Sequence, residues 1–144
     1  MNITQRLPLA LLFLRLGVFL VMLMWTLDKL IKPDHASNVF KKYYGVGIDT
    51  GVFYIVGIVE LLLVLAFVAG FAKRWTYGIV LVLHGVSTLA AFGNYLDPWS
   101  HLTFFAAWPV LAACFALYYL RDADTLMALD KGGVASTRAS LATN

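Results

Sequence analysis

The sequence predicts an all-α membrane protein: an antiparallel bundle of four transmembrane helices with a short interfacial helix after the first span. Composition is the first observation behind this fold class. Of the 144 residues, 61% are apolar and 13% are charged, and the mean hydropathy is +0.80, whereas soluble domains are about 45–50% apolar and about 25% charged. A soluble chain of this length buries too little surface to hide so many apolar side chains. We therefore expect a lipid bilayer to solvate most of the surface.

The second observation is a set of four apolar segments with the length of a membrane span. At about 1.5 Å per residue they reach about 27–37 Å, against a hydrocarbon core of about 30 Å. They cover residues 7–31, 50–70, 75–92 and 102–120. The first differs from a signal peptide, because Arg15 interrupts its apolar run and no small-x-small cleavage site follows it. Without repeats or long linkers, residues 1–130 form one transmembrane domain.

The connections predict how the spans are arranged. Only residues 71–74 join the second and third spans, which requires an antiparallel hairpin. Asp97-Pro98 marks a turn between the third and fourth spans. In the first connection, residues 34–44 gather apolar and aromatic side chains on one helical face, a pattern typical of a helix lying in the membrane interface. These side chains are Val39, Phe40, Tyr43 and Tyr44.

Two further segments follow the last span. Residues 121–130 repeat the amphipathic pattern, with Leu126, Met127 and Leu129 as the apolar side. In residues 131–144, Gly, Ala, Ser and Thr dominate, and we expect a disordered cytoplasmic tail.

The distribution of Lys and Arg predicts the orientation. Six lie on the side of the two termini, namely Arg6, Lys73, Arg74, Arg121, Lys131 and Arg138. Four lie on the opposite side, namely Lys29, Lys32, Lys41 and Lys42. Because cytoplasmic loops carry an excess of Lys and Arg, we expect a multi-pass protein of the inner (plasma) membrane with both termini in the cytoplasm. The charges are not gathered in one patch, so no nucleic-acid partner is expected.

Three ionisable side chains interrupt three different spans. Arg15, Glu60 and His84 each lie about 12–15 Å from the cytoplasmic edge of their span. A charge at the bilayer centre costs about 2.5–3.5 kcal/mol on insertion scales, so such residues pair with one another and mark functional sites. We expect a buried Arg15–Glu60 ion pair completed by His84. The polar residues on nearby helical faces extend this candidate binding cluster: Thr26, Lys29, Tyr77 and Thr88.

Each of these features also has a purely structural interpretation. The Arg15–Glu60 pair can serve only to fix the register of the bundle, and His84 can be a core histidine with a satisfied hydrogen bond. Cys114 is the only cysteine, which excludes an intramolecular disulfide and a C-x-x-C redox pair. No metal site is expected, because His35 and His101 lack a spaced set of partner ligands.

Several motifs resemble the DoxX-like family of small membrane proteins. Residues 14–17 (Leu-Arg-Leu-Gly), with Trp25 and residues 27–30 (Leu-Asp-Lys-Leu), resemble the first helix of the family. Residues 57–62 (Gly-Ile-Val-Glu-Leu-Leu) are similar to its glycine–glutamate motif, and residues 120–125 to the ending of some members. The resemblance covers about residues 10–130. Trp25-Thr26-Leu27 departs from it, because many members place a glycine before the lysine.

The resemblance implies a four-helix bundle with Arg15, Lys29 and Glu60 in the matching positions. Family members include a subunit associated with thiosulfate:quinone oxidoreductase, a membrane component of amine dehydrogenase maturation, and assembly factors. The first functional hypothesis is therefore an accessory or assembly subunit of a membrane redox system, which binds a partner protein or a second copy of itself within the bilayer. The sequence favours it, because a dinucleotide loop, a cysteine pair and a haem-type ligand set are missing.

The alternative hypothesis is a quinone- or proton-handling subunit of an oxidoreductase that uses Arg15, Glu60 and His84. A quinone is the cofactor that this alternative implies, since a quinone site needs little more than an apolar cleft and one or two hydrogen-bonding groups. No catalytic residue is identified under either hypothesis.

Overall fold

The computed structural model describes residues 3–130, which form helices, turns and loops without a strand in that range. The long helices are α1 (Ile3–Ile31), α3 (Thr50–Val68), α4 (Lys73–Ala90) and α6 (Ala107–Tyr119). The shorter elements are α2 (Pro33–Tyr44), α5 (Phe92–Tyr95) and the 3₁₀ helix η1 (Leu102–Ala106). The predicted tail of residues 131–144 lies outside the described residues.

Three helical segments in the described range are long and apolar enough to cross a membrane. They are Arg6–Ile31, Thr50–Val68 and Leu102–Tyr119, the last of which joins η1 to α6. The helix α4 lies where the sequence predicts the third span, but it is not one of the three. Its polar side chains lower its mean hydropathy, and they include Lys73, Arg74 and His84. The all-helical class and the apolar helices of a membrane protein are thus confirmed.

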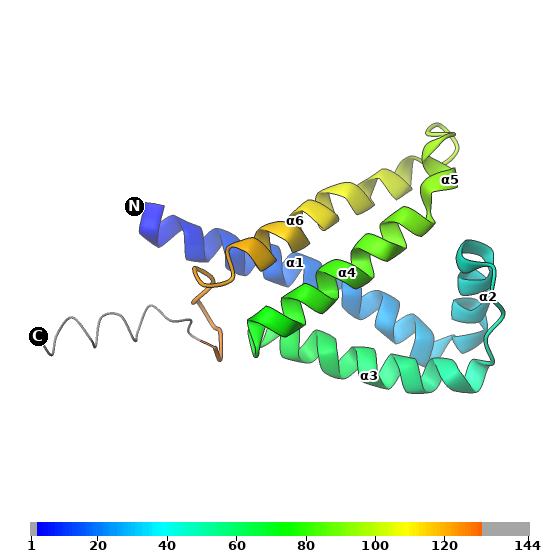
Figure 1. Cartoon of the computed structure of the whole chain (residues 1–144), viewed down its shortest axis with the longest axis horizontal. Helices are drawn as coiled ribbons and strands as arrows, with labels where there is room; N and C mark the ends of the chain where they lie inside the picture. The colour runs from blue at the N-terminus through cyan, green and yellow to red at the C-terminus, as the bar shows by residue number, and fades with distance from the viewer. Residues whose placement is uncertain (1–2, 131–144) are drawn as a thin grey trace, which may run out of the picture.

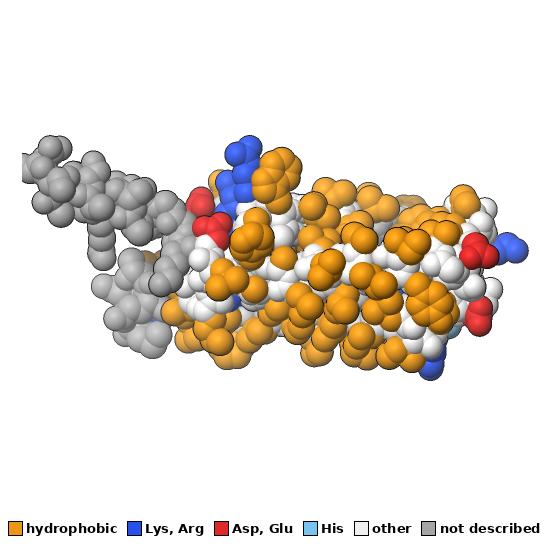
Figure 2. Space-filling model, turned by 90° about the horizontal axis from the view of Figure 1, so that it is seen from below, with side chains coloured by type: hydrophobic (Ala, Val, Ile, Leu, Met, Phe, Trp, Pro, Cys, Tyr) orange, Lys and Arg blue, Asp and Glu red, His pale blue; other side chains and the backbone are white. Residues whose placement is uncertain are grey.

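The four long helices form a ring in which each helix packs against two others. The helix α1 contacts α3 and α6, and α4 also contacts α3 and α6. The chain runs along α1, returns along α3, runs forward along α4 and returns along α6 (Figure 1). The core side chains come from all four helices: Leu11, Val18, Met22, Val64, Phe67, Tyr77, Val80, Cys114 and Leu117. Hydrophobic side chains also cover the flank of the molecule, and charged side chains gather at its two ends (Figure 2). This surface suits contact with lipid.

The helix α2 lies at one end of the molecule and matches the range predicted for it. Pro33 begins it, and Gly45 ends it in a left-handed conformation with φ 72°, donating its N–H to the Lys41 carbonyl. Its aromatic face packs on the protein: Phe40 lies 5.8 Å from the Phe53 ring. Tyr43 contacts the Phe104 ring and accepts a hydrogen bond from Asn94. We call this end the α2 end.

The segment after α6 forms turns rather than the amphipathic element expected from its sequence. Residues 121–130, which we call the strap, cross to the turn between α3 and α4. There the N–H groups of Leu129 and Asp130 donate to the carbonyls of Ala69 and Gly70 over 2.9 and 3.0 Å. These bonds satisfy carbonyls that the end of α3 leaves free. The predicted apolar side of the strap points outward, while Asp124 is fully buried. This end of the molecule is the strap end.

Candidate functional site

The predicted Arg15–Glu60 ion pair is wrong, because each residue pairs with a different partner. Arg15 pairs with Asp124 of the strap over 3.1 Å, and Glu60 pairs with Lys29 of α1 over 3.0 Å. The predicted depths placed Arg15 and Glu60 at one level. In the structure Arg15 lies beside Gly70, ten residues beyond Glu60 and therefore about 15 Å away along α3. The bounds of the first span agree with the helical segment Arg6–Ile31, but the assumption that residue 7 lies level with Gly70 is wrong, because Arg15 lies beside Gly70.

The Arg15 cluster consists of Arg15, Lys73, Tyr77 and Asp124 at the strap end. Arg15 Nη1 donates to Asp124 Oδ2 and, over 3.3 Å, to the Tyr77 hydroxyl. Tyr77 in turn donates to the same Asp124 oxygen over 2.6 Å. The Arg15, Tyr77 and Asp124 residues have no exposed surface. A carboxylate, a guanidinium and a phenol thus form a closed triangle in a dry environment, where such bonds are strong.

Backbone carbonyls of the strap complete this cluster. Arg15 Nη2 donates to the carbonyls of Leu126 and Met127. Lys73 is 2% exposed, and its ammonium donates to the carbonyls of Arg121 and Asp124, each over 2.9 Å. The strap therefore supplies one carboxylate and four carbonyls to two buried cations.

Gly70 makes room for the Arg15 cluster. Its φ of +61° is a conformation that favours glycine. A Cβ at this position would lie 2.7 Å from Arg15 Nη1 and 2.7 Å from the Ala128 side chain. The turn from α3 to α4 thus requires glycine both for its backbone and for the close approach of the guanidinium.

The Glu60 cluster consists of Thr26 and Lys29, in the last two turns of α1, and Glu60, near the centre of α3. Lys29 Nζ lies 3.2 and 3.0 Å from the two carboxylate oxygens of Glu60, and the Thr26 hydroxyl lies 3.0 Å from one of them. The side chains of Lys29 and Glu60 keep 20% and 13% of their exposure. Gly57, one turn before Glu60, lets α1 approach closely, since its Cβ would lie 2.7 Å from Leu30.

His84 joins neither cluster. Its Nε2 lies 3.1 Å from the carbonyl oxygen of Ala107 at the start of α6. Thr88 donates its hydroxyl proton to the His84 carbonyl over 2.7 Å, a bond within α4. The expectation that His84 completes an Arg15–Glu60 pair is therefore wrong, and its alternative as a core histidine with a satisfied hydrogen bond agrees with the contacts. The seven predicted site residues thus divide into three groups: Arg15 with Tyr77, Thr26 and Lys29 with Glu60, and His84 with Thr88.

Asp124 and Lys73 are the residues of the Arg15 cluster that the sequence did not identify. Asp124 is 109 residues from Arg15, and no periodicity connects the two. Lys73 was assigned to the charged edge of a span. The available signal was Arg15 itself, because a buried guanidinium requires a carboxylate and only a few acidic residues lie near span ends on its side.

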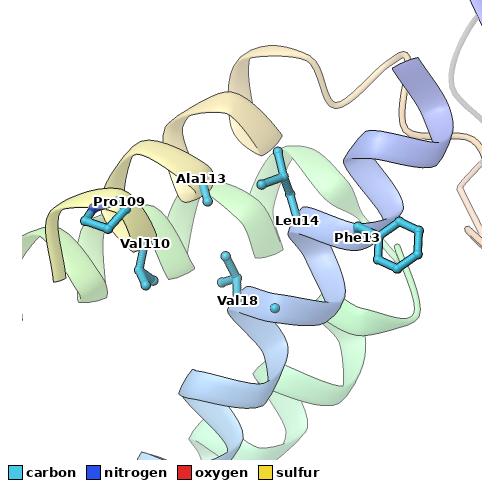
Figure 3. Close-up of a pocket in the computed structure, with 7 residues that line it drawn as sticks. Phe13, Leu14, Val18, Pro109, Val110 and Ala113 are labelled. Carbon is cyan, nitrogen blue, oxygen red and sulfur yellow. The ribbon is translucent and has the colours of Figure 1, made fainter. Parts of the chain in front are cut away.

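An apolar groove of about 260 Å³ lies between α1 and α6. Val18 of α1 and Val110 and Ala113 of α6 border it from opposite sides (Figure 3). Its other lining residues are Phe13, Leu14, Gly17 and Pro109. A Cβ at Gly17 would meet no atom within 4 Å, so the groove is open at this point. Its walls provide shape and apolar surface but no charged side chain.

Residues 3–130 contain no group of three His, Cys, Asp or Glu side chains that could hold a metal ion. Comparisons with protein-family models, with curated proteins and with solved structures find no match to this chain.

Proposed function

We propose that this chain is a membrane-embedded accessory or assembly subunit that binds a partner protein within the bilayer. Its four long helices form an antiparallel four-span bundle, in which α4 is the third span along the chain and adds to the three apolar segments. The polar face of α4 supports this assignment, because Lys73, Tyr77 and His84 all bond within the protein. A helix whose polar groups are satisfied internally can lie in hydrocarbon despite a modest hydropathy.

The groove between α1 and α6 is the observation that carries this proposal. With the strap in place, the charged side chains of both clusters are paired inside the molecule, so neither cluster presents an unpaired charge to a partner protein. The groove instead offers an open apolar surface with an exposed glycine among its lining residues, and close approach at small residues drives helix association in membranes. The resemblance of residues 14–17 and 57–62 to DoxX-like proteins supports a redox system as the setting of the partner.

The proposed orientation places both termini and the strap end in the cytoplasm, in the inner membrane, with α2 outside. The bias of Lys and Arg supports it. Cysteines introduced at Ser37 and Ser136 in a Cys114→Ala background test it by labelling of intact cells. Position 37 should react with an impermeant reagent. Labelling of position 136 by the same reagent in intact cells would show that the orientation is the opposite of the proposed one.

Filling the groove tests partner binding. Gly17→Leu places a side chain in open space, so the free energy of unfolding should change little, while recovery of the partner by affinity purification should fall at least tenfold. Val82→Phe is the matched control, because Val82 is 63% exposed on α4, away from the groove. A photo-crosslinking amino acid at position 17 should capture a defined protein or a second copy. Equal recovery with Gly17→Leu and wild type would refute the groove as the docking site.

Proton handling is a second candidate function, supported by the partial exposure of Glu60 and Lys29 inside a predicted span. An intramembrane carboxylate is a functional candidate by default. A single quinone head-group site cannot be formed by Arg15, Glu60 and His84, because the three residues lie apart. Glu60→Gln should then reduce proton-coupled activity of the partner complex without reducing partner recovery. Unchanged activity of the Glu60→Gln complex, together with the absence of quinone from the purified complex, would reject proton handling and leave only the accessory role.

A further inference from the structure

The Arg15 cluster contains an excess of positive charge. Three charged residues are buried in the described range: Arg15 and Lys73, which are cations, and Asp124. Two buried cations are thus accompanied by one carboxylate, which pairs with Arg15, whereas Lys73 bonds backbone carbonyls of Arg121 and Asp124. Burial of an unbalanced charge is costly, so the excess cation requires negative or strongly polar ligands.

Almost all of these ligands come from the strap rather than from the helices. Apart from the Tyr77 hydroxyl, each acceptor found for Arg15 and Lys73 in the described part of the chain belongs to residues 121–127. If the strap is removed, α1 and α4 present a guanidinium, an ammonium and a phenol at one place. Such a set of donors binds anions, and the planar guanidinium matches a carboxylate in particular.

The strap fills this place incompletely. Asp124 Oδ1 and Arg15 Nε are buried and have no hydrogen-bond partner among the described residues. Met127, whose carbonyl bonds Arg15, has a φ of 50°, a left-handed conformation that is unfavourable for a non-glycine residue. A ligand with an optimal fit would leave neither orphaned atoms nor backbone strain.

We infer that Arg15, Lys73 and Tyr77 form an anion-binding site for a carboxylate ligand, and that Asp124 occupies it as an internal ligand. The site binds a compact monoanion, because Arg15 and Tyr77 converge on a single carboxylate oxygen. The ligand is a free carboxylic acid or a carboxylate carried by another polypeptide. The second source would make the strap a competitor of a partner at this site.

Chemical rescue tests the inference. Asp124→Ala removes the carboxylate and leaves a space of the size of formate. In the full chain purified in detergent, replacing chloride with formate at constant ionic strength should raise the Tm of this variant by roughly 3–6 °C at about ten times the Kd. Above the Kd, the rise in Tm should grow with the logarithm of the formate concentration. Wild type and Asp122→Ala should not respond, because Asp124 still fills the site and Asp122 is exposed.

A second preparation covers the case in which Asp124→Ala does not fold in chloride. The variant is then purified in formate throughout, and it should unfold when formate is removed. The peptide acetyl-Ala-Asp-Thr-amide, tested beside formate, separates the two sources: stabilisation by formate indicates a free acid, and stabilisation by the peptide alone indicates a carboxylate on a polypeptide. No stabilisation by either ligand, or an equal response of Asp122→Ala, overturns the inference.

Discussion

At the strap end, the Arg15 and Asp124 side chains have no exposure, whereas the Lys29 and Glu60 side chains keep 20% and 13%. Both ion pairs include a cation from α1, and both have a glycine beside them. They differ in the number of elements that surround them. The Glu60 cluster is built by α1 and α3 alone, while α1, α4 and the strap contribute to the Arg15 cluster.

This difference teaches that helix pairing alone leaves an intramembrane ion pair partly open. A segment that crosses the end of the helices is what closes the Arg15 cluster. A closed pair contributes to stability but has no access to ligands unless the closing segment moves. An open pair contributes less and keeps part of its surface exposed.

Arg15→Leu is expected to cause the largest loss of stability. It leaves Asp124 buried without its cation, and breaking a buried pair costs about 3–5 kcal/mol. Glu60→Leu leaves Lys29 partly exposed and able to reach a polar environment, so we expect about 1–2 kcal/mol. Denaturant titration of the purified variants in detergent measures both, with Leu62→Ala at an exposed position of α3 as the control. Equal losses would remove the distinction between the closed and the open pair.

Substitutions of the glycines beside the two clusters should cause intermediate losses of unfolding free energy. Gly70→Ala strains a positive φ and presses on Arg15, so we expect a loss of about 2–3 kcal/mol. Gly57→Ala presses on Leu30, a side chain that can shift, and should cost about 1 kcal/mol. Gly17→Ala has no contact and should be neutral or stabilising by up to about 1 kcal/mol. Thermal unfolding in detergent ranks the three, and a reversed order of Gly70 and Gly57 contradicts the account.

His84→Phe should have the smallest effect. The change removes one hydrogen bond, to the carbonyl of Ala107, at roughly constant volume. A single hydrogen bond contributes about 0.5–1.5 kcal/mol. Partner recovery from cells expressing the variant should equal that of wild type. A loss of recovery with normal thermal stability would instead return His84 to the list of functional residues.

The sequence predicted the helices well because their signals are local. Apolar length defined α1, α3 and the segment from η1 to α6, and Pro33 and Gly45 marked the ends of α2. It also identified Arg15, Glu60 and Lys29 as ionisable residues of the first two spans. Each of these statements depends on residues within one segment of the chain.

The pairing could not be predicted, because it depends on how far each helix is shifted along its axis. The first span has nearly the predicted bounds, but Arg15 lies level with the turn at Gly70 instead of with Glu60. Nor does an amphipathic pattern reveal that residues 121–130 turn back over the helices. Asp124 therefore escaped notice, although it is the carboxylate that neutralises Arg15.

A pair of double-mutant cycles tests most directly the claim that the two clusters are separate. Residues in contact show coupling, whereas distant sites add within about 0.3–0.5 kcal/mol. The losses of unfolding free energy in Arg15→Leu and Glu60→Leu should therefore add in the double variant. The losses in Arg15→Leu and Asp124→Ala should fall short of additivity by about 2–3 kcal/mol, since either change already breaks the pair. Strong coupling of Arg15 with Glu60, together with additivity of Arg15 and Asp124, would contradict the account.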